Sequence, residues 1–324
     1  MLWVEDRREN DFALSALVQL QKCPLCGSGD IRTLYPSYDF RVSRAWFDIC
    51  SCRSCGYVFT NPRPPEEDAA AFYNTGYYAY QPQKPVSPVA PPAPERGAGP
   101  GERILDIGCG SGGWLLGQRR PGRELYGVEI SAHAVEAARG QGLDVRLGTL
   151  EAARFPDGFF DLVRLNHVLE HVYDPRRTLL EIRRILKDDG RCEFEIPNFQ
   201  SFESARYKGA WNALDVPRHI SHFTAPVLER LIRECGLRLR AMHFVWFPAG
   251  IAQAAGYLRH EFTTWRRLCL EMRANRSFPG RAFVPVAAGG RLAAGFAVYW
   301  WRRLTGKAKP PERHAIAVTL GKSS

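Results

Sequence analysis

Short apolar runs alternate with longer amphipathic segments through the middle of the chain. The runs at residues 103–107, 125–130 and 160–165 predict strands, because each is short and is bounded by glycine or polar residues. After Pro175 and again after Thr224, apolar residues recur at helical spacing. Strands that alternate with helices in this way predict an α/β domain.

The loop after the first of these strands combines a carboxylate with glycines. Glycine lets the backbone approach a ligand closely, and Gly108, Gly110 and Gly113 also fit the G-x-G-x-x-G pattern of a dinucleotide site. Glu129 ends the next strand. A carboxylate there can accept hydrogen bonds from both ribose hydroxyls, either of a dinucleotide or of a nucleoside that carries a sulfonium amino acid. Asp106 discriminates between these two ligands. A dinucleotide site usually has an apolar residue at this position, whereas a cationic ligand such as a sulfonium amino acid gains from an acid.

The order of five blocks resembles the class I S-adenosylmethionine-dependent methyltransferases. The first two blocks are the glycine loop and the strand ending at Glu129. The third, residues 148–151, ends a third strand, and the fourth, residues 160–171, forms a fourth strand and its exit. The fifth, residues 185–190, precedes a fifth strand at 192–197. Residues 168–175 are similar to the branch of the ubiquinone-biosynthesis O-methyltransferases, the type 11/23 methyltransferases. The resemblance covers residues 102–236. It implies S-adenosylmethionine as cofactor and a doubly wound, mostly parallel, seven-stranded Rossmann-like sheet.

The resemblance also implies which residues surround the cofactor: Asp106, Gly108, Gly110, Glu129, Ile130, Thr149, Leu150 and Asn166. Asp106 and the two glycines would hold the methionyl moiety, Glu129 the ribose, and Thr149 with Leu150 the adenine. Many relatives carry Asp where this chain has Thr149. A hydroxyl cannot replace a carboxylate facing the adenine amino group, so adenine recognition should rely more on backbone groups.

Four of the nine cysteines form two C-x-x-C-G motifs, at Cys23 and Cys26 and at Cys52 and Cys55. Two such knuckles can place four thiolates tetrahedrally around one structural zinc ion. A redox dithiol is the alternative, but it needs only one pair and a thioredoxin-like context that is missing here. If Cys50 replaced Cys52 as a ligand, the two-residue spacing to Cys55 would be lost, so Cys50 is expected not to be a ligand.

The motifs divide the chain into three parts. Residues 1–80 hold an N-terminal helix, the zinc ribbon and an aromatic segment, and they resemble the N-terminal regions of bacterial methyltransferases from sugar and polysaccharide gene clusters. Residues 81–100 contain seven prolines and predict a stiff linker. Residues 101–324 form the methyltransferase domain, with a basic and apolar insertion at about 240–310.

The acceptor side of the domain is expected to involve histidines. Transfer to oxygen needs a base near the hydroxyl, and His171 and His219 are the candidates. His219 lies in residues 211–224, which follow the fifth strand and combine a tryptophan, an acid, an arginine and two histidines. His167, Glu170 and His171 form an alternative two-histidine, one-carboxylate metal set. Otherwise these side chains only shape the strand exit.

Charge is distributed unevenly. Residues 202–324 hold 20 Lys and Arg against 7 Asp and Glu, or +13, so the first 201 residues balance at −3. This charge is interleaved with apolar stretches, which favours peripheral contact with an anionic membrane surface. A helical cover within the domain, or a homodimer contact through residues 298–301, is the alternative.

Charged residues near the start argue against a signal peptide, so a cytoplasmic protein is expected.

These observations predict O-methylation of a small molecule: a sugar, a glycan or glycolipid precursor, or a prenylated phenol. An RNA methyltransferase is the second hypothesis, because a zinc ribbon and a basic tail also suit a phosphate backbone. The long apolar run speaks against a nucleic-acid groove. A non-catalytic regulator that binds S-adenosylmethionine is the third hypothesis.

Overall fold

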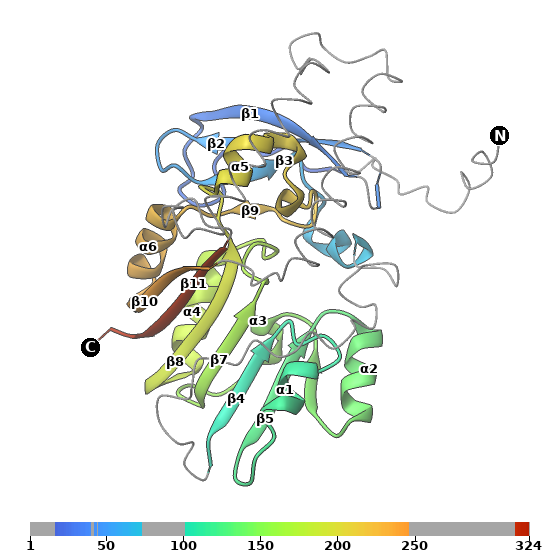
Figure 1. The fold of residues 1–324 in the computed structure, drawn as a ribbon, viewed down its shortest axis with the longest axis vertical. Helices are drawn as coiled ribbons and strands as arrows, with labels where there is room; N and C mark the ends of the chain where they lie inside the picture. The colour runs from blue at the N-terminus through green and yellow to red at the C-terminus, as the bar shows by residue number, and fades with distance from the viewer. Residues whose placement is uncertain (1–16, 40–41, 44, 73–100, 246–314, 324) are drawn as a thin grey trace, which may run out of the picture.

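The computed structural model describes residues 17–39, 42–43, 45–72, 101–245 and 315–323 of the 324-residue chain (Figure 1). The expected linker and the apolar part of the tail, residues 246–314, lie outside the described residues, as does most of the aromatic segment. Among the described residues, no helix is both long enough and apolar enough to cross a membrane.

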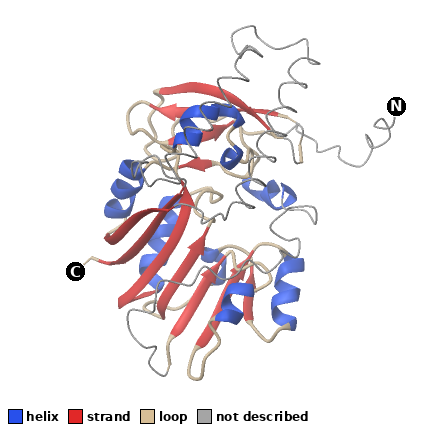
Figure 2. Cartoon of the chain, viewed as in Figure 1, coloured by secondary structure: helices blue, strands red, loops and turns tan. Residues whose placement is uncertain are grey.

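A seven-stranded sheet forms the body of the chain (Figure 2). Its strands, in spatial order, are β10 (Leu237–Val245), β11 (Ala315–Lys322), β8 (Leu186–Pro197), β7 (Phe160–Asn166), β4 (Arg103–Ile107), β5 (Glu124–Glu129) and β6 (Asp144–Leu147). The strands from β8 to β6 run parallel, whereas β11 pairs antiparallel with both β8 and β10. The predicted doubly wound, mostly parallel, seven-stranded sheet is confirmed.

Helices cover both faces of this sheet. They are α1 (Gly113–Gly117), α2 (Ala132–Gly140), α3 (Leu150–Ala153), α4 (Pro175–Ile185) and α6 (Ala225–Glu234). A further helix, α5 (Phe202–Tyr207), lies beside the second sheet described below (Figure 1). Successive strand residues point to opposite faces. Ile104 and Leu162 therefore pack with α1 and α2, whereas Leu105 and Val163 pack with α4 and α6.

Two element boundaries differ from the sequence prediction. The fifth strand, expected at 192–197, begins earlier, because Leu186 is already the first residue of β8 and is fully buried. The third strand, expected to run through 148–151, ends at Leu147, and Leu150 begins α3. Thr149 causes this change, because its hydroxyl accepts a hydrogen bond from Ala152 N at 3.3 Å and so caps a helix.

A second, four-stranded sheet carries the cysteine motifs. Its strands, in spatial order, are β1 (Ile31–Tyr38), β2 (Trp46–Cys52), β3 (Val58–Asn61) and β9 (Ser221–His222), and all neighbours are antiparallel. The last strand comes from the region between β8 and α6, about 160 residues after β3 in the chain. The half of the chain that builds the seven-stranded sheet therefore also supplies one strand of the cysteine-bearing sheet.

A buried apolar cluster reinforces this connection. It consists of Phe47, Ile49 and Val58 from the four-stranded sheet and of Trp211, Leu214 and Val216 from the segment before β9. Burying large side chains from both halves stabilises the junction by roughly 1.5–3 kcal/mol for each fully buried side chain.

Arg218 forms a buried ion cluster at the same junction. Its Nη2 lies 2.7 Å from Asp215 Oδ1 and 3.2 Å from Asp39 Oδ1. The side chains of all three residues are at most 4% exposed. A guanidinium in this setting is held by the two carboxylates, which offset its cost of desolvation.

Replacing Arg218 with Met should lower the free energy of unfolding by about 3–5 kcal/mol, because two buried carboxylates lose their cation. Urea denaturation followed by circular dichroism measures the change. Arg103→Met removes an arginine that pairs with the more exposed Glu124, and it should cost less than about 1 kcal/mol. Equal losses for the two variants would contradict this role of Arg218.

Candidate functional site

The glycine loop follows β4 and leaves space beside its backbone. Gly108, Gly110 and Gly112 all have positive φ, at 69°, 53° and 83°. A Cβ on Gly108 would lie 2.6 Å from a methyl carbon of Val168, and one on Gly112 would lie 2.2 Å from Leu143 Cδ1. A Cβ on Gly110 would meet nothing within 4 Å. Packing thus requires two of the glycines, and the third leaves room for a ligand.

Glu129 joins this loop at the end of β5. Its side chain is buried, Oε2 accepts a hydrogen bond from Gly110 N at 2.9 Å, and Oε1 accepts one from Ser131 N at 2.9 Å. Gly148 N in turn donates to the Glu129 carbonyl oxygen, which places the start of α3 nearby. The structure therefore brings together the loop and the carboxylate that the sequence assigns to the ribose.

Asp106 lies on β4 opposite Arg164 of β7, a residue that sequence reasoning missed. Arg164 Nη1 is 2.8 Å from Asp106 Oδ1. Burial raises the pKa of Asp106 to about 6, although the guanidinium of Arg164 opposes the shift. The available signal was the single arginine within the apolar run of β7.

The remaining predicted cofactor residues lie at neighbouring strand ends. Ile130 follows β5 with 39% of its surface exposed, whereas Leu150 is buried in the core. Asn166 is the last residue of β7 and is half-buried. The hydroxyl of Thr149 is engaged in capping α3.

The two histidines that the sequence predicts to act on the acceptor lie next to each other. The rings of His171 and His219 lie 4.5 Å apart, centre to centre, in an edge-to-face arrangement. The Nδ1–H of His171 donates to the Arg218 carbonyl oxygen at 3.0 Å, and that of His219 donates to the Ala213 carbonyl oxygen at 2.9 Å. These bonds leave Nε2 of each ring as the unprotonated nitrogen in a neutral imidazole.

Glu170 completes this group. Its Oε2 is buried and accepts no hydrogen bond from the described residues. Potential ligand atoms of Glu170, His171 and His219 all lie within 4.8 Å of one another, so these residues could hold a divalent cation. His167 lies outside this set of three potential ligands. Both of its ring nitrogens face carboxylates instead: Nδ1 is 3.2 Å from Glu170 Oε1, and Nε2 is 3.7 Å from Glu195 Oε1.

The protonation states in this group are strongly biased. Burial and the nearby His219 lower the pKa of His171 to about 4. Burial would lower the pKa of His167 as well, but hydrogen bonds to Glu170 and Glu195 raise it to about 10. Burial would raise the pKa of Glu170, but the hydrogen bond from His167 brings it to about 2. Near neutral pH, His171 is neutral, His167 is protonated and Glu170 is ionised.

The four-stranded sheet holds the histidine loop from the other side. Thr60 Oγ1 donates to the His219 carbonyl oxygen at 2.8 Å and lies 3.1 Å from His222 Nε2. The hydroxyls of Tyr57 and Ser221 also share a hydrogen bond. On the side of the seven-stranded sheet, the amides of Ile220 and Ser221 both donate to the Glu170 carbonyl oxygen at 3.0 Å. The loop carrying His219 is thus fixed between the two sheets.

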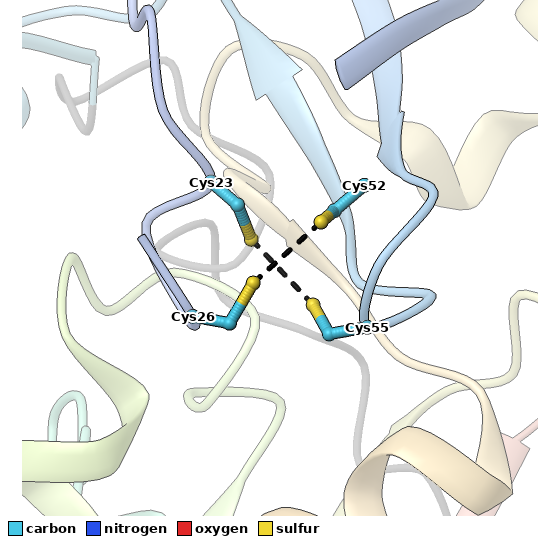
Figure 3. Close-up of side chains that lie close together, drawn as sticks. All are labelled: Cys23, Cys26, Cys52 and Cys55. Atoms are coloured by element: carbon cyan, nitrogen blue, oxygen red, sulfur yellow. Dashed lines mark hydrogen bonds between the residues drawn. The ribbon is translucent and has the colours of Figure 1, made fainter. Parts of the chain in front are cut away.

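The four predicted cysteine ligands converge at the base of the second sheet (Figure 3). The Sγ atoms of Cys23 and Cys55 are 3.6 Å apart, as are those of Cys26 and Cys52. A disulfide would require about 2.05 Å. Tetrahedral coordination with zinc–sulfur bonds of about 2.3 Å gives sulfur separations of about 3.8 Å, so the arrangement fits a zinc ion. Cys50 is buried on β2 outside this group.

Comparisons with known proteins identify the family to which the chain belongs. Residues 76–241 match the family model described as a methyltransferase domain, so the chain belongs to this family of class I S-adenosylmethionine-dependent methyltransferases. A ubiquinone biosynthesis O-methyltransferase from Cereibacter sphaeroides is 34% identical over 149 residues, which cover 42% of this chain and 60% of that protein.

Two further relatives show the range of the similarity. A 2-phytyl-1,4-naphtoquinone methyltransferase from Trichormus variabilis is 35% identical over 33% of this chain and 53% of its own length. The solved structure of YcgJ from Bacillus subtilis matches with a TM-score of 0.45 and 19% identity, covering 69% of this chain and 93% of that one. The aligned region spans only about half to three fifths of the length of these two curated methyltransferases.

The buried His222 should make stability depend on pH. Burial, followed by the neighbouring His219, lowers the pKa of His222 to about 3. Because the folded protein favours the neutral ring, the unfolding free energy should fall as pH drops from about 6.5 towards 3, by at most about 1.4 kcal/mol per pH unit from this residue. Urea titrations at several pH values measure the slope.

His222→Gln should flatten this slope while keeping a polar partner for Thr60. His133→Gln serves as the control, because His133 lies at the start of α2, away from the junction. The same slope in parent and His222→Gln would show that His222 does not titrate in this way.

Proposed function

We propose that this chain transfers a methyl group from S-adenosylmethionine to a hydroxyl group of a small, ring-shaped acceptor. The observation that carries the proposal is the arrangement of two sets of residues along one sheet edge. Asp106, the glycine loop and Glu129 provide the acidic, open cradle that suits a cationic nucleoside. The loop 167–171 leaves the adjacent strand β7 and leads to the paired histidines.

When bound, S-adenosylmethionine supplies an electrophilic methyl group on a sulfonium. The chain's own contribution is to bind this group, to orient the acceptor and to remove its proton. His219 or His171 accepts the hydroxyl proton at Nε2, since Nδ1 of each ring donates to a carbonyl oxygen. The buried Glu170 carboxylate stabilises the imidazolium that forms.

Two acceptor classes are favoured by different observations. The quinone-pathway names of two relatives support a prenylated phenol. The similarity of the N-terminal region to methyltransferases from polysaccharide clusters supports a sugar or glycan precursor. Incubation with methyl-labelled S-adenosylmethionine and both acceptor classes distinguishes them, and transfer to RNA alone would overturn the small-molecule proposal.

Glu129→Ala and Asp106→Ala should each weaken S-adenosylmethionine binding by about 1–3 kcal/mol, the cost of leaving polar groups of the ligand unpaired. Isothermal calorimetry measures the affinity. Glu124→Ala is the matched control, because Glu124 is the exposed acid at the opposite end of β5. Parent-like binding by both site variants would place the cofactor elsewhere, and preference for a nicotinamide dinucleotide would reject the proposed activity.

We also propose that the four clustered cysteines hold one structural zinc ion. Each C-x-x-C motif ends in the same tight turn, in which the amide of Gly27 or Gly56 donates to the carbonyl oxygen of the first cysteine. Four thiolates close the coordination shell and leave no position for a substrate. The zinc would then stabilise the sheet that holds the histidine loop, without taking part in methyl transfer.

Changing any one of Cys23, Cys26, Cys52 or Cys55 to Ser should remove the zinc, because a three-thiolate site binds it far less tightly. Elemental analysis of the purified chain gives the metal content, with one zinc per chain expected in the parent. Cys50→Ser is the control and should keep its zinc. Loss of zinc in the control together with its retention in Cys52→Ser would reverse the ligand assignment.

A further inference from the structure

Asp106 and Arg164 form a charged pair beside the glycine loop that the proposed cofactor contacts leave unexplained. The two residues face each other across β4 and β7, and one hydrogen bond of 2.8 Å joins them. No other hydrogen bond to the Asp106 carboxylate occurs within the described part of the chain. The pair therefore presents one negative and one positive group side by side.

The two partners differ in their exposure. The side chain of Asp106 is 2% exposed, whereas that of Arg164 is 22% exposed. Among the described residues, Arg164 donates a hydrogen bond only through Nη1, although a guanidinium carries five donors. The arginine therefore keeps donors available to a ligand.

Trp114 fixes the guanidinium of Arg164 next to the loop. The guanidinium carbon lies 4.5 Å from the centre of the indole ring. Trp114 belongs to the first turn of α1, which follows the glycine loop directly. Stacking of this kind holds an arginine in one orientation while leaving its edge free to donate.

We propose that Arg164 binds the carboxylate of the amino-acid portion of S-adenosylmethionine, while Asp106 faces its ammonium group. An α-amino acid carries both charges on one carbon, so adjacent groups of opposite sign match it. This inference rests on the proposed function, since it deepens the cofactor site. It makes Arg164 the residue that distinguishes S-adenosylmethionine from analogues without the carboxylate.

Decarboxylated S-adenosylmethionine is the appropriate probe, because it keeps the sulfonium and the ammonium and lacks only the carboxylate. The full-length parent should bind S-adenosylmethionine about tenfold to a hundredfold more tightly than this analogue, as expected for one charge-assisted contact. Arg164→Gln should lose most of this preference by weakening the S-adenosylmethionine complex selectively. Calorimetry with both ligands gives the two affinities for each protein.

Arg103→Gln is the matched control. Arg103 lies on β4, the strand of Asp106, but at the opposite end from the loop. It pairs with Glu124, and its guanidinium carbon lies 4.3 Å from the centre of the Phe159 ring. It should keep the parent's preference. Equal affinity of the parent for both ligands would overturn the proposal without any variant, as would an undiminished preference in Arg164→Gln.

Equal weakening of both ligands in Arg164→Gln would also overturn it, because Arg164 would then act only by supporting Asp106. These results are distinguishable from failure of the proposed function. In that case the parent would bind neither S-adenosylmethionine nor its decarboxylated analogue.

Discussion

The buried contact of Arg218 with Asp215 and Asp39 is the constraint on which the pair of His171 and His219 depends. The three side chains are withdrawn from water, so each charge requires the others in place. Asp39 belongs to the cysteine-bearing part, whereas Arg218 immediately precedes His219. Fixing this arginine also fixes its carbonyl oxygen, which accepts the hydrogen bond that orients His171. One ion cluster thus sets the positions of both histidines.

The central sheet was predictable because its determinants are local. Strands β4, β5 and β7 come from short apolar runs, and α4 begins with an aspartate cap and a proline. Strand β9 was not predictable. It consists of two residues, and its pairing with β3 depends on Thr60 and on Tyr57, more than 150 residues earlier in the chain. No periodicity within 221–222 indicates that partner.

The same distinction separates the parts of the candidate site. Asp106, the loop glycines and Glu129 belong to a motif whose members are set by adjacent strand ends, so the sequence could group them. The partners of Glu170 were harder to assign, because His219 reaches it from 49 residues away while His167 lies between Glu170 and Glu195. Arg164 escaped notice because its partner lies on another strand, where only the register of β4 and β7 reveals it.

The late position of β9 in the sequence also has a consequence for synthesis of the chain. During translation, β1, β2 and β3 emerge first, and β3 then presents an unpaired edge until residues 221–222 appear. Exposed strand edges are templates for pairing with other chains. Contacts so distant in sequence also form slowly, because a long loop must close first. The first sheet to be synthesised is therefore completed only after most of the second has formed, and the nascent chain is most prone to association in that interval.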